Sequence, residues 1–345
     1  MIHRVGGCRE DRVRYALITG GLGFIGSHIA KNLLNKELVD RVVLVDHYGS
    51  FVSPVGAGFV DRRRQRLAGI EHCCDIERAQ VQHFGVLTSI LGRYRPVYIF
   101  HLAALPLASL QNSSAEEAVD GTVASTNNLL TICTLLQEQG GYMPDRFVYA
   151  SSSMVYGDFQ YTPADELHPL KPRNIYGTMK LAGEVCTLGL ARSFGIKASV
   201  VRPSAVYGPT DMNRRVTQVF IDNAIAGEPL VIHGREDALD FTYVEDVADG
   251  FVLAATREEA VGEVFNITAG HAYTLVEYAE LLKRYFPGLT YEVVERDGTR
   301  PKRGTLSIDK ARGMLGYQPS HSLADGLHKY IAFRREGAAA ECPNP

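Results

Sequence analysis

A glycine-rich turn near the N-terminus constrains the fold more than any other feature of the sequence. Residues 14–20 form a short apolar run that is typical of a buried strand, and residues 24–34 repeat apolar side chains at helical spacing. Between them stands TGGLGFIGSH, with Gly20, Gly23 and Gly26 three residues apart. A strand, a glycine turn and a helix in this order predict a site where backbone N–H groups and a helix N-terminus hold a pyrophosphate.

Each glycine in this turn has a physical role, and a later carboxylate completes the pattern. Gly20 allows the tight turn, Gly23 lets the backbone approach the phosphates, and Gly26 lets the helix pack close to the strand. Asp46 ends the next apolar strand, where it would meet the ribose hydroxyls of a dinucleotide. Because a carboxylate repels a 2′-phosphate, Asp46 predicts NAD rather than NADP.

The rest of the chain alternates apolar strands with helices up to Pro203. Because each strand is continuously apolar, the pattern predicts a doubly wound parallel sheet with helices on both faces, a Rossmann arrangement of the α/β class. The expected strands are 14–20, 41–46, 71–76, 97–104, 146–153 and 197–203, and the main helices after the first are 113–137 and 174–194.

After Pro203 the rhythm changes to a mixture of shorter elements. Helices are expected at 212–227, 244–256, 274–286 and 307–316, and strands at 229–232, 263–267 and 290–295. We therefore expect a smaller mixed α/β substrate domain. The predicted division is a flexible tail (1–14), the NAD-binding domain (15–203), a mainly substrate-binding domain (204–336) from which about 240–267 returns to the sheet, and a second flexible tail (337–345).

Composition excludes several classes of protein. Of the 345 residues, 46% are hydrophobic and 22% are charged, which is the opposite of the balance in a disordered chain. The net charge of −3 provides no strong field for nucleic acid or an anionic membrane surface. No apolar stretch is long enough to span a membrane, and the first residues lack the apolar core of a signal peptide. The six cysteines form no CxxC pair, no metal-site spacing occurs, and reduced thiols in a cytoplasmic protein are expected.

Three side chains form a candidate catalytic set. Tyr176 and Lys180 are four residues apart in a helical segment, so they share one helix face. A nearby ammonium and a positive nicotinamide ring favour the phenolate of Tyr176, which could take a proton from a sugar hydroxyl as a hydride leaves the same carbon. Ser152 lies at the end of the fifth strand, at the sheet edge where ligands bind, and its hydroxyl could bridge the phenolate and the substrate oxygen.

Several motifs together resemble one known family. The chain contains TGGLGFIGSH, Asp75-Ile76, HLAA at 101–104, YASSSMVYGD at 149–158, YGTMK at 176–180, RPSAVYGP at 202–209 and DFTYVEDVADG at 240–250. This ordered set resembles the extended short-chain dehydrogenases/reductases, and within them the NAD-dependent nucleotide-sugar epimerases and dehydratases, whose type enzyme is UDP-glucose 4-epimerase.

The resemblance implies a set of cofactor and substrate contacts. It implies a tightly held NAD, a substrate cleft between two domains and a homodimer. Ser152, Tyr176 and Lys180 would be catalytic, and Ser152, Ser153, Tyr176 and Arg300 would contact the nucleotide sugar. The implied cofactor contacts are Gly20, Gly23, Phe24, Ile25, Gly26, Asp46, Asp75 and Ile76 at the adenine, Leu102, Ala103, Ala104, Tyr176, Lys180 and Pro203.

Departures from the family pattern narrow the reaction. The family's 4,6-dehydratases carry an Asp-Glu pair where this chain has Ser153 and Met154, and its decarboxylases keep a Glu at the second position. Since neither residue can act as an acid or base, the resemblance favours C4 epimerisation of a UDP-sugar through a transient 4-keto intermediate. Ala205 and Leu239 replace an Asn and an Arg that hold the sugar diphosphate in many epimerases, and Arg300 aligns with another family arginine near it.

The sequence is also compatible with other functions. A dehydratase, a decarboxylase or a net NAD-dependent sugar oxidoreductase could use the same scaffold, and a non-catalytic NAD-binding regulatory protein would be expected to lack Tyr176 or Lys180. The sequence does not name the sugar, the nucleotide base or the role of the long connection at 47–69.

Overall fold

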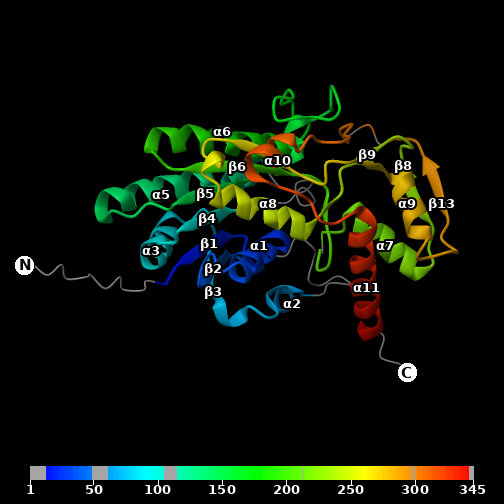
Figure 1. The fold of residues 1–345 in the computed structure, drawn as a ribbon, viewed down its shortest axis with the longest axis horizontal. Coiled ribbons are helices and arrows are strands. Elements are labelled where there is room, and N and C mark those ends of the chain that lie inside the picture. The colour runs from blue at the N-terminus through cyan, green and yellow to red at the C-terminus, as the bar shows by residue number, and fades with distance from the viewer. Residues whose placement is uncertain are drawn as a thin grey trace, which may run out of the picture.

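A seven-stranded parallel sheet forms the centre of the molecule (Figure 1). The computed structural model describes residues 13–48, 61–104, 115–211, 213–296, 298 and 300–341. The strands of this sheet are β1 (Tyr15–Thr19), β2 (Arg41–Asp46), β3 (Cys74–Arg78), β4 (Tyr98–His101), β5 (Arg146–Ala150), β6 (Ala198–Pro203) and β11 (Val264–Ile267). Their order is β3-β2-β1-β4-β5-β6-β11 and every neighbouring pair is parallel. The predicted fold class is confirmed.

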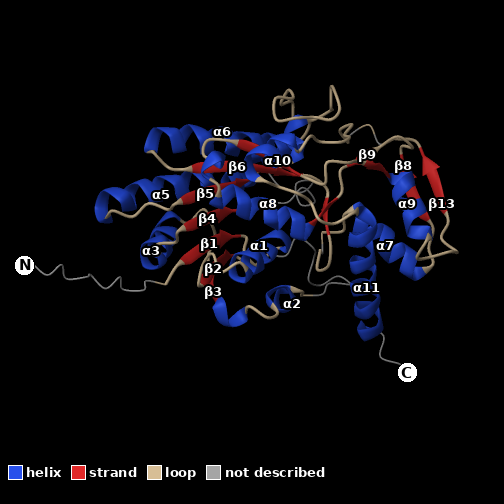
Figure 2. Cartoon of the chain, in the orientation of Figure 1, coloured by secondary structure: helices blue, strands red, loops and turns tan. Residues whose placement is uncertain are grey.

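Helices cover both faces of the sheet (Figure 2). One face carries α1 (Phe24–Asn35), α8 (Val244–Thr256) and α10 (Asp309–Leu315), and the other carries α3 (Phe84–Tyr94), α5 (Ser125–Gly140) and α6 (Ile175–Phe194). Because side chains alternate along each strand, Ile18, Phe100 and Val148 enter the first layer, while their neighbours Leu17, Ile99 and Phe147 enter the second.

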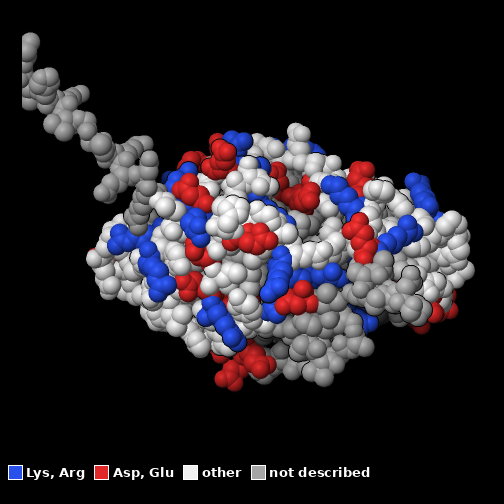
Figure 3. All heavy atoms as spheres, turned by 90° about the horizontal axis from the view of Figure 1, so that it is seen from below, with Lys and Arg blue, Asp and Glu red and all other residues white. Residues whose placement is uncertain are grey.

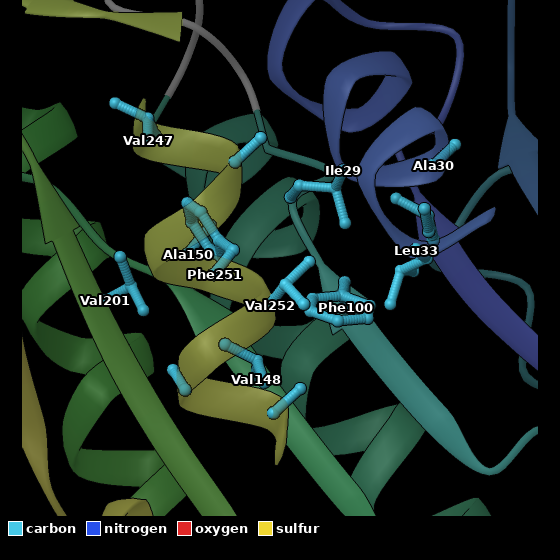
Figure 4. Close-up of a cluster of buried hydrophobic side chains, with 14 of the residues drawn as sticks. Ile29, Ala30, Leu33, Phe100, Val148, Ala150, Val201, Val247, Phe251 and Val252 are labelled. Carbon is cyan, nitrogen blue, oxygen red and sulfur yellow. The ribbon is translucent and has the colours of Figure 1, made fainter. Parts of the chain in front are cut away.

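The first layer packs around two helices that are far apart in the sequence. Figure 4 shows Ile29 and Leu33 of α1 close to Phe100 of β4, with Phe251 and Val252 of α8 beside them. All five side chains are buried. This contact fixes the helix that follows the glycine turn against the centre of the sheet.

Helix α2 (Arg63–Leu67) packs beside α1, and most of the elements after β6 form a smaller region. This region has a hydrophobic cluster of its own. The cluster packs α7 (Val216–Ala226), α9 (Leu275–Lys283) and α11 (Leu323–Glu341) around the parallel pair β8 (Leu230–His233) and β13 (Tyr291–Val294). Two further pairs join β7 (Val206–Tyr207) to β10 (Thr242–Tyr243) and β9 (Ala238–Leu239) to β12 (Tyr273–Thr274).

The structure differs from the sequence-based expectation in several elements, and α3, α11 and the short strands β7, β9, β10 and β12 were not expected at all. The single helix expected at 113–137 is α4 (Ala115–Val119), a π-helical turn (Asp120–Ala124) and then α5; residues 113 and 114 lie outside the described part. Helix α10 also packs on the sheet, through Ala311 and Leu315, in addition to the expected return at 240–267. Helix α11 continues to Glu341, into the tail expected from 337, because its alanines favour helix.

The distribution of surface charge and the polarity of the helices agree with the small net charge and the mixed composition of the chain. On the face shown in Figure 3, acidic and basic side chains are interspersed. None of the helices in the described part of the chain has the length and apolar content that a membrane crossing requires.

Candidate active site

The glycine turn joins β1 to α1 at the carboxyl edge of the sheet. Gly20 has a φ of +68°, which only glycine adopts readily, and a Cβ on Gly26 would lie 2.6 Å from the carbonyl oxygen of Gly20. A side chain at Gly20 or Gly26 would therefore strain or displace the turn. Phe24 and Ile25, predicted to contact the cofactor, are the first residues of α1.

Asp46 is held in place directly beside this turn. Its carboxylate accepts hydrogen bonds from Leu22 N at 3.2 Å and from Tyr48 N at 3.0 Å. The carboxylate thus lies at the end of β2, next to the turn, as a contact to a ribose diol requires. A bare cradle with a fixed carboxylate beside it fits a dinucleotide.

Leu102, Ala103, Ala104 and Pro203 lie along the same edge. Leu102 N donates to the Thr19 carbonyl and Ala103 N to the Thr19 hydroxyl, both at 3.2 Å, so residues 102–104 run close to Gly20. Asp75 and Ile76 lie within β3, opposite Val43 and Leu44 of β2 and before the carboxyl end of the strand, and Ile76 is 45% exposed. The carboxylate of Asp75 forms a two-point ion pair with Arg41. Pro203 ends β6 at this edge.

The structure brings Ser152, Tyr176 and Lys180 together. Asn174 caps α6 by accepting from Gly177 N at 2.8 Å, and Tyr176 and Lys180 follow in the first two turns. The Lys180 Nζ lies 5.9 Å from the ring centre of Tyr176 and donates to the Ala150 carbonyl at 2.6 Å. Ser152, two residues beyond Ala150, hydrogen-bonds to Tyr176.

The protonation of this set is governed by burial. Burial raises the pKa of Tyr176, while the charge of Arg215 and the Ser152 hydrogen bond oppose that rise. Burial lowers the pKa of Lys180 to about 8, and the charge of Glu184 opposes that fall. The protein alone therefore holds Tyr176 as a phenol, and a further positive charge is needed to favour the phenolate.

Ser153 and Met154 begin a buried 3-10 turn (Ser153–Tyr156) that follows Ser152. The carbonyl of Met154 lies against α6, and a Cβ on Gly177 would approach it to 2.6 Å. This tight contact fixes the turn against the start of the helix. Neither side chain is a carboxylic acid, so these two positions supply no general acid beside Ser152.

Three arginines give the site a positive side. Arg303 is half-buried and its Nε finds no hydrogen-bond partner among the residues that the structure describes. Burial together with the charges of Arg300 and Arg215 lowers its pKa to about 10. Arg300 is exposed, and its carbonyl accepts from Arg296 at 2.6 Å. Arg215 acts electrostatically on both Arg303 and Tyr176. This arrangement suits an anionic ligand.

Sequence reasoning missed several residues around the set. Arg215 opens α7 and was not singled out, because nothing in its local pattern marks it. Glu184 and Arg202 form a buried ion pair behind Lys180. The spacing of Tyr176, Lys180 and Glu184, four residues each, is the one signal that could have placed Glu184 on the same face of α6.

The histidine at the end of β4 belongs to the buried core. His101 is buried between the hydroxyls of Thr19 at 2.7 Å and Thr126 at 3.1 Å, and burial lowers its pKa to about 3. In the described ranges, no three His, Cys, Asp or Glu side chains gather closely enough to hold a metal ion.

Comparison with known proteins identifies the family. The model of the NAD dependent epimerase/dehydratase family matches residues 16–268. The chain belongs to this family. The resemblance noted in the sequence is thereby confirmed, and the cofactor of this family member is NAD, as predicted.

Relatives within the epimerase/dehydratase family include more than one activity. The chain is 29% identical over 325 residues to the uncharacterized UDP-glucose epimerase YtcB of Bacillus subtilis, covering 92% of this chain and 96% of that one. It is 27% identical over 334 residues to a dTDP-glucose 4,6-dehydratase of Actinoplanes, covering 92% and 97%. The structure is similar to that of UDP-glucuronic acid 4-epimerase from Bacillus cereus in complex with UDP-glucuronic acid and NAD, with a TM-score of 0.80, 26% identity and coverage of 93% and 99%.

Proposed function

We propose that this protein is an NAD-dependent nucleotide-sugar epimerase that inverts C4 of a UDP-sugar. The observation that carries the proposal is the grouping of Ser152, Tyr176 and Lys180 beside the dinucleotide cradle, with the non-acidic Ser153 and Met154 next to Ser152. Such a site can oxidise and reduce one carbon, but it lacks the second acid that water elimination requires.

Tyr176, Ser152 and Lys180 would each have a separate role in the reaction. Tyr176, as the phenolate, takes the proton of the C4 hydroxyl. Ser152 donates a hydrogen bond to the substrate oxygen and orients it toward Tyr176. Lys180 adds a positive charge one helical turn from the phenol. When held at the glycine turn and Asp46, NAD would supply a reversible hydride acceptor for C4, so that the 4-keto sugar could turn before C4 is reduced again. Tyr176 then gives the proton back.

The substrate class follows from charge and from the relatives. Arg215 acts on Tyr176, and Arg303 lies within reach of the charges of both Arg215 and Arg300, so positive charge extends from Tyr176 in a way that suits the diphosphate of a nucleotide sugar. Arg303 could supply the charge that Leu239 does not. The names of the B. subtilis relative and the B. cereus structural neighbour both specify UDP-sugars, and we therefore propose uracil as the base.

A binding and turnover panel tests this proposal. NAD-loaded protein is mixed with UDP-, dTDP-, GDP- and CDP-sugars, and thermal unfolding and the NMR spectrum of the sugar are followed. We expect a UDP-sugar at 100 times its dissociation constant to stabilise the fold by about 2.7 kcal/mol and to yield its C4 epimer. A 6-deoxy-4-keto product, or steady release of NADH, would instead indicate a dehydratase or a net oxidoreductase.

A further inference from the structure

A buried ion pair lies directly behind the catalytic set. Arg202 of β6 donates from Nε to one oxygen of Glu184 at 2.8 Å and from Nη2 to the other at 2.6 Å. The two side chains are only 3% and 4% exposed. Because removal of either partner would leave a buried charge uncompensated, the two residues form a unit.

The carboxylate of this pair also binds the strand end that precedes Ser152. The hydroxyl of Ser151 donates to Glu184 Oε1. Ser151 is in turn fixed to the neighbouring strand by its N–H, which donates to the Val201 carbonyl at 2.8 Å. Glu184 thus ties the end of β5 to α6, the helix that carries Tyr176 and Lys180.

The arginine of the pair binds the other end of the same segment. Its Nη1 donates to the Tyr156 hydroxyl at 2.9 Å, and that hydroxyl donates to Asn266 of β11 at 2.7 Å. Tyr156 is the last residue of the 3-10 turn after Ser152. The ion pair therefore holds both ends of the segment from Ser151 to Tyr156, with Ser152 between them.

The same carboxylate is part of the electrostatic environment of Lys180. Around Lys180 lie Tyr176 and Glu184 on α6, Tyr149 of β5 with its ring centre 5.3 Å from Nζ, the carbonyl of Ala150, and His101 of β4, which burial keeps neutral. Among the residues the structure describes, Glu184 is the one carboxylate that raises the pKa of Lys180.

We propose that Glu184 is a positioning residue: with Arg202 it clamps the segment that carries Ser152 against α6, and its charge keeps Lys180 protonated beside Tyr176. The inference rests on the proposed function for the roles of Ser152, Tyr176 and Lys180. It adds a residue that touches neither sugar nor cofactor and acts through these three.

Tyr176 and Lys180 titrate as a coupled pair, so a charge that acts on Lys180 also changes the pH at which Tyr176 ionises. Loss of one proton yields either a neutral amine beside a phenol or an ammonium beside a phenolate. The charge of Glu184 favours the second form. Without it, the pair shifts toward the neutral amine, and more alkaline conditions are needed to form the phenolate.

Tyrosinate absorbance measures this directly and needs no sugar. The protein and its Tyr176→Phe variant are titrated with NAD bound, and the difference isolates the ionisation of Tyr176. We expect Glu184→Gln to raise the midpoint by about one pH unit. An unchanged midpoint in folded, NAD-loaded Glu184→Gln would overturn the proposal.

Two further variants keep the outcome clear. If Glu184→Gln does not fold because Arg202 is left unpaired, the double variant Glu184→Gln/Arg202→Met removes both charges, and the same rise is expected. Asp246→Asn is the matched control, because Asp246 is also buried and accepts hydrogen bonds from Ser320 and His321, away from Lys180. A rise of equal size in Asp246→Asn would mean general loosening of the fold and would also contradict the proposal.

Ser151→Ala tests the clamp separately from the charge. It keeps the Glu184 side chain and its ion pair with Arg202 but removes the contact to the strand end, and the Ser152 hydrogen bond lowers the pKa of Tyr176. We expect a smaller rise in the midpoint than in Ser152→Ala, and no rise would show that the clamp does not position Ser152. Since none of these titrations uses a sugar, their failure is distinguishable from failure of the proposed epimerase activity.

Discussion

Tyr176 has Lys180 one helical turn away on α6 and the hydroxyl of Ser152 beside its phenol. The four-residue spacing to Lys180 and the place of Ser152 after a strand were both readable, because helix faces and parallel strand ends follow from local patterns. The pairing of Glu184 with Arg202 was not readable, because it joins a helix to a strand across a turn whose path the sequence does not specify.

Replacement of the phenol tests the role of Tyr176. Tyr176→Phe should fold and retain NAD, since the ring still packs, but turnover should fall by about 10²–10⁴-fold because the proton acceptor is absent. Ser152→Ala should cost less, because it removes an orienting hydrogen bond and leaves the base. Steady-state rates on the same UDP-sugar decide this, and a Tyr176→Phe enzyme within a few-fold of the parent would contradict it.

The choice between NAD and NADP depends on Asp46. Its carboxylate is fixed by Leu22 N and Tyr48 N beside the glycine turn, where it would repel a 2′-phosphate. We expect calorimetry to show strong binding of NAD and weak binding of NADP, and Asp46→Ala to narrow that difference. Equal affinities in the parent protein would refute this account of Asp46.

At the scale of elements, the sheet was predictable and some helices were not. Continuously apolar strands marked the parallel sheet because both of its faces are buried. The π-helical turn at Asp120–Ala124 has no pattern of its own, so 113–137 read as one helix. The apolar residues of α10 would suit either hydrophobic core, and only the fold shows that Ala311 and Leu315 pack on the sheet.

The packing of α6 against the turn after Ser152 provides an element-scale test. A Cβ on Gly177 would lie 2.6 Å from the Met154 carbonyl and 3.0 Å from Pro172, so Gly177→Ala should move the turn and lower stability by about 1–3 kcal/mol, with a loss of turnover. Gly189 of the same helix has open space around it. Gly189→Ala should therefore gain up to about 1 kcal/mol from helix propensity. Thermal unfolding of both variants compares them, and equal effects would contradict this view of Gly177.

At the scale of the whole molecule, we propose a two-fold dimer through α5 and α6. Leu129 and Leu130 of α5 are fully buried in the chain's own core and leave nothing for a partner. Other apolar side chains of these helices remain available, because Val185 is 65% exposed and Leu188 and Leu190 are half-buried. An apolar patch on paired helices suits a second copy of the chain.

A charge placed in this patch tests the dimer. Val185→Glu should convert the protein to a monomer at micromolar concentration in light scattering, while Val231→Glu should not, because Val231 is exposed on β8, outside α5 and α6. A monomeric parent protein would rule out the proposed assembly.

In the proposed reaction a single carbon of the sugar, C4, is oxidised and then reduced. The most direct measurement follows deuterium placed at C4 of the UDP-sugar substrate through a complete turnover of NAD-loaded protein in ordinary water. We predict an inverted product that keeps deuterium at C4, with no NADH released. Deuterium found at C6, or lost to the solvent, would contradict the account and would mean that proton transfer at other carbons takes place despite the non-acidic Ser153 and Met154.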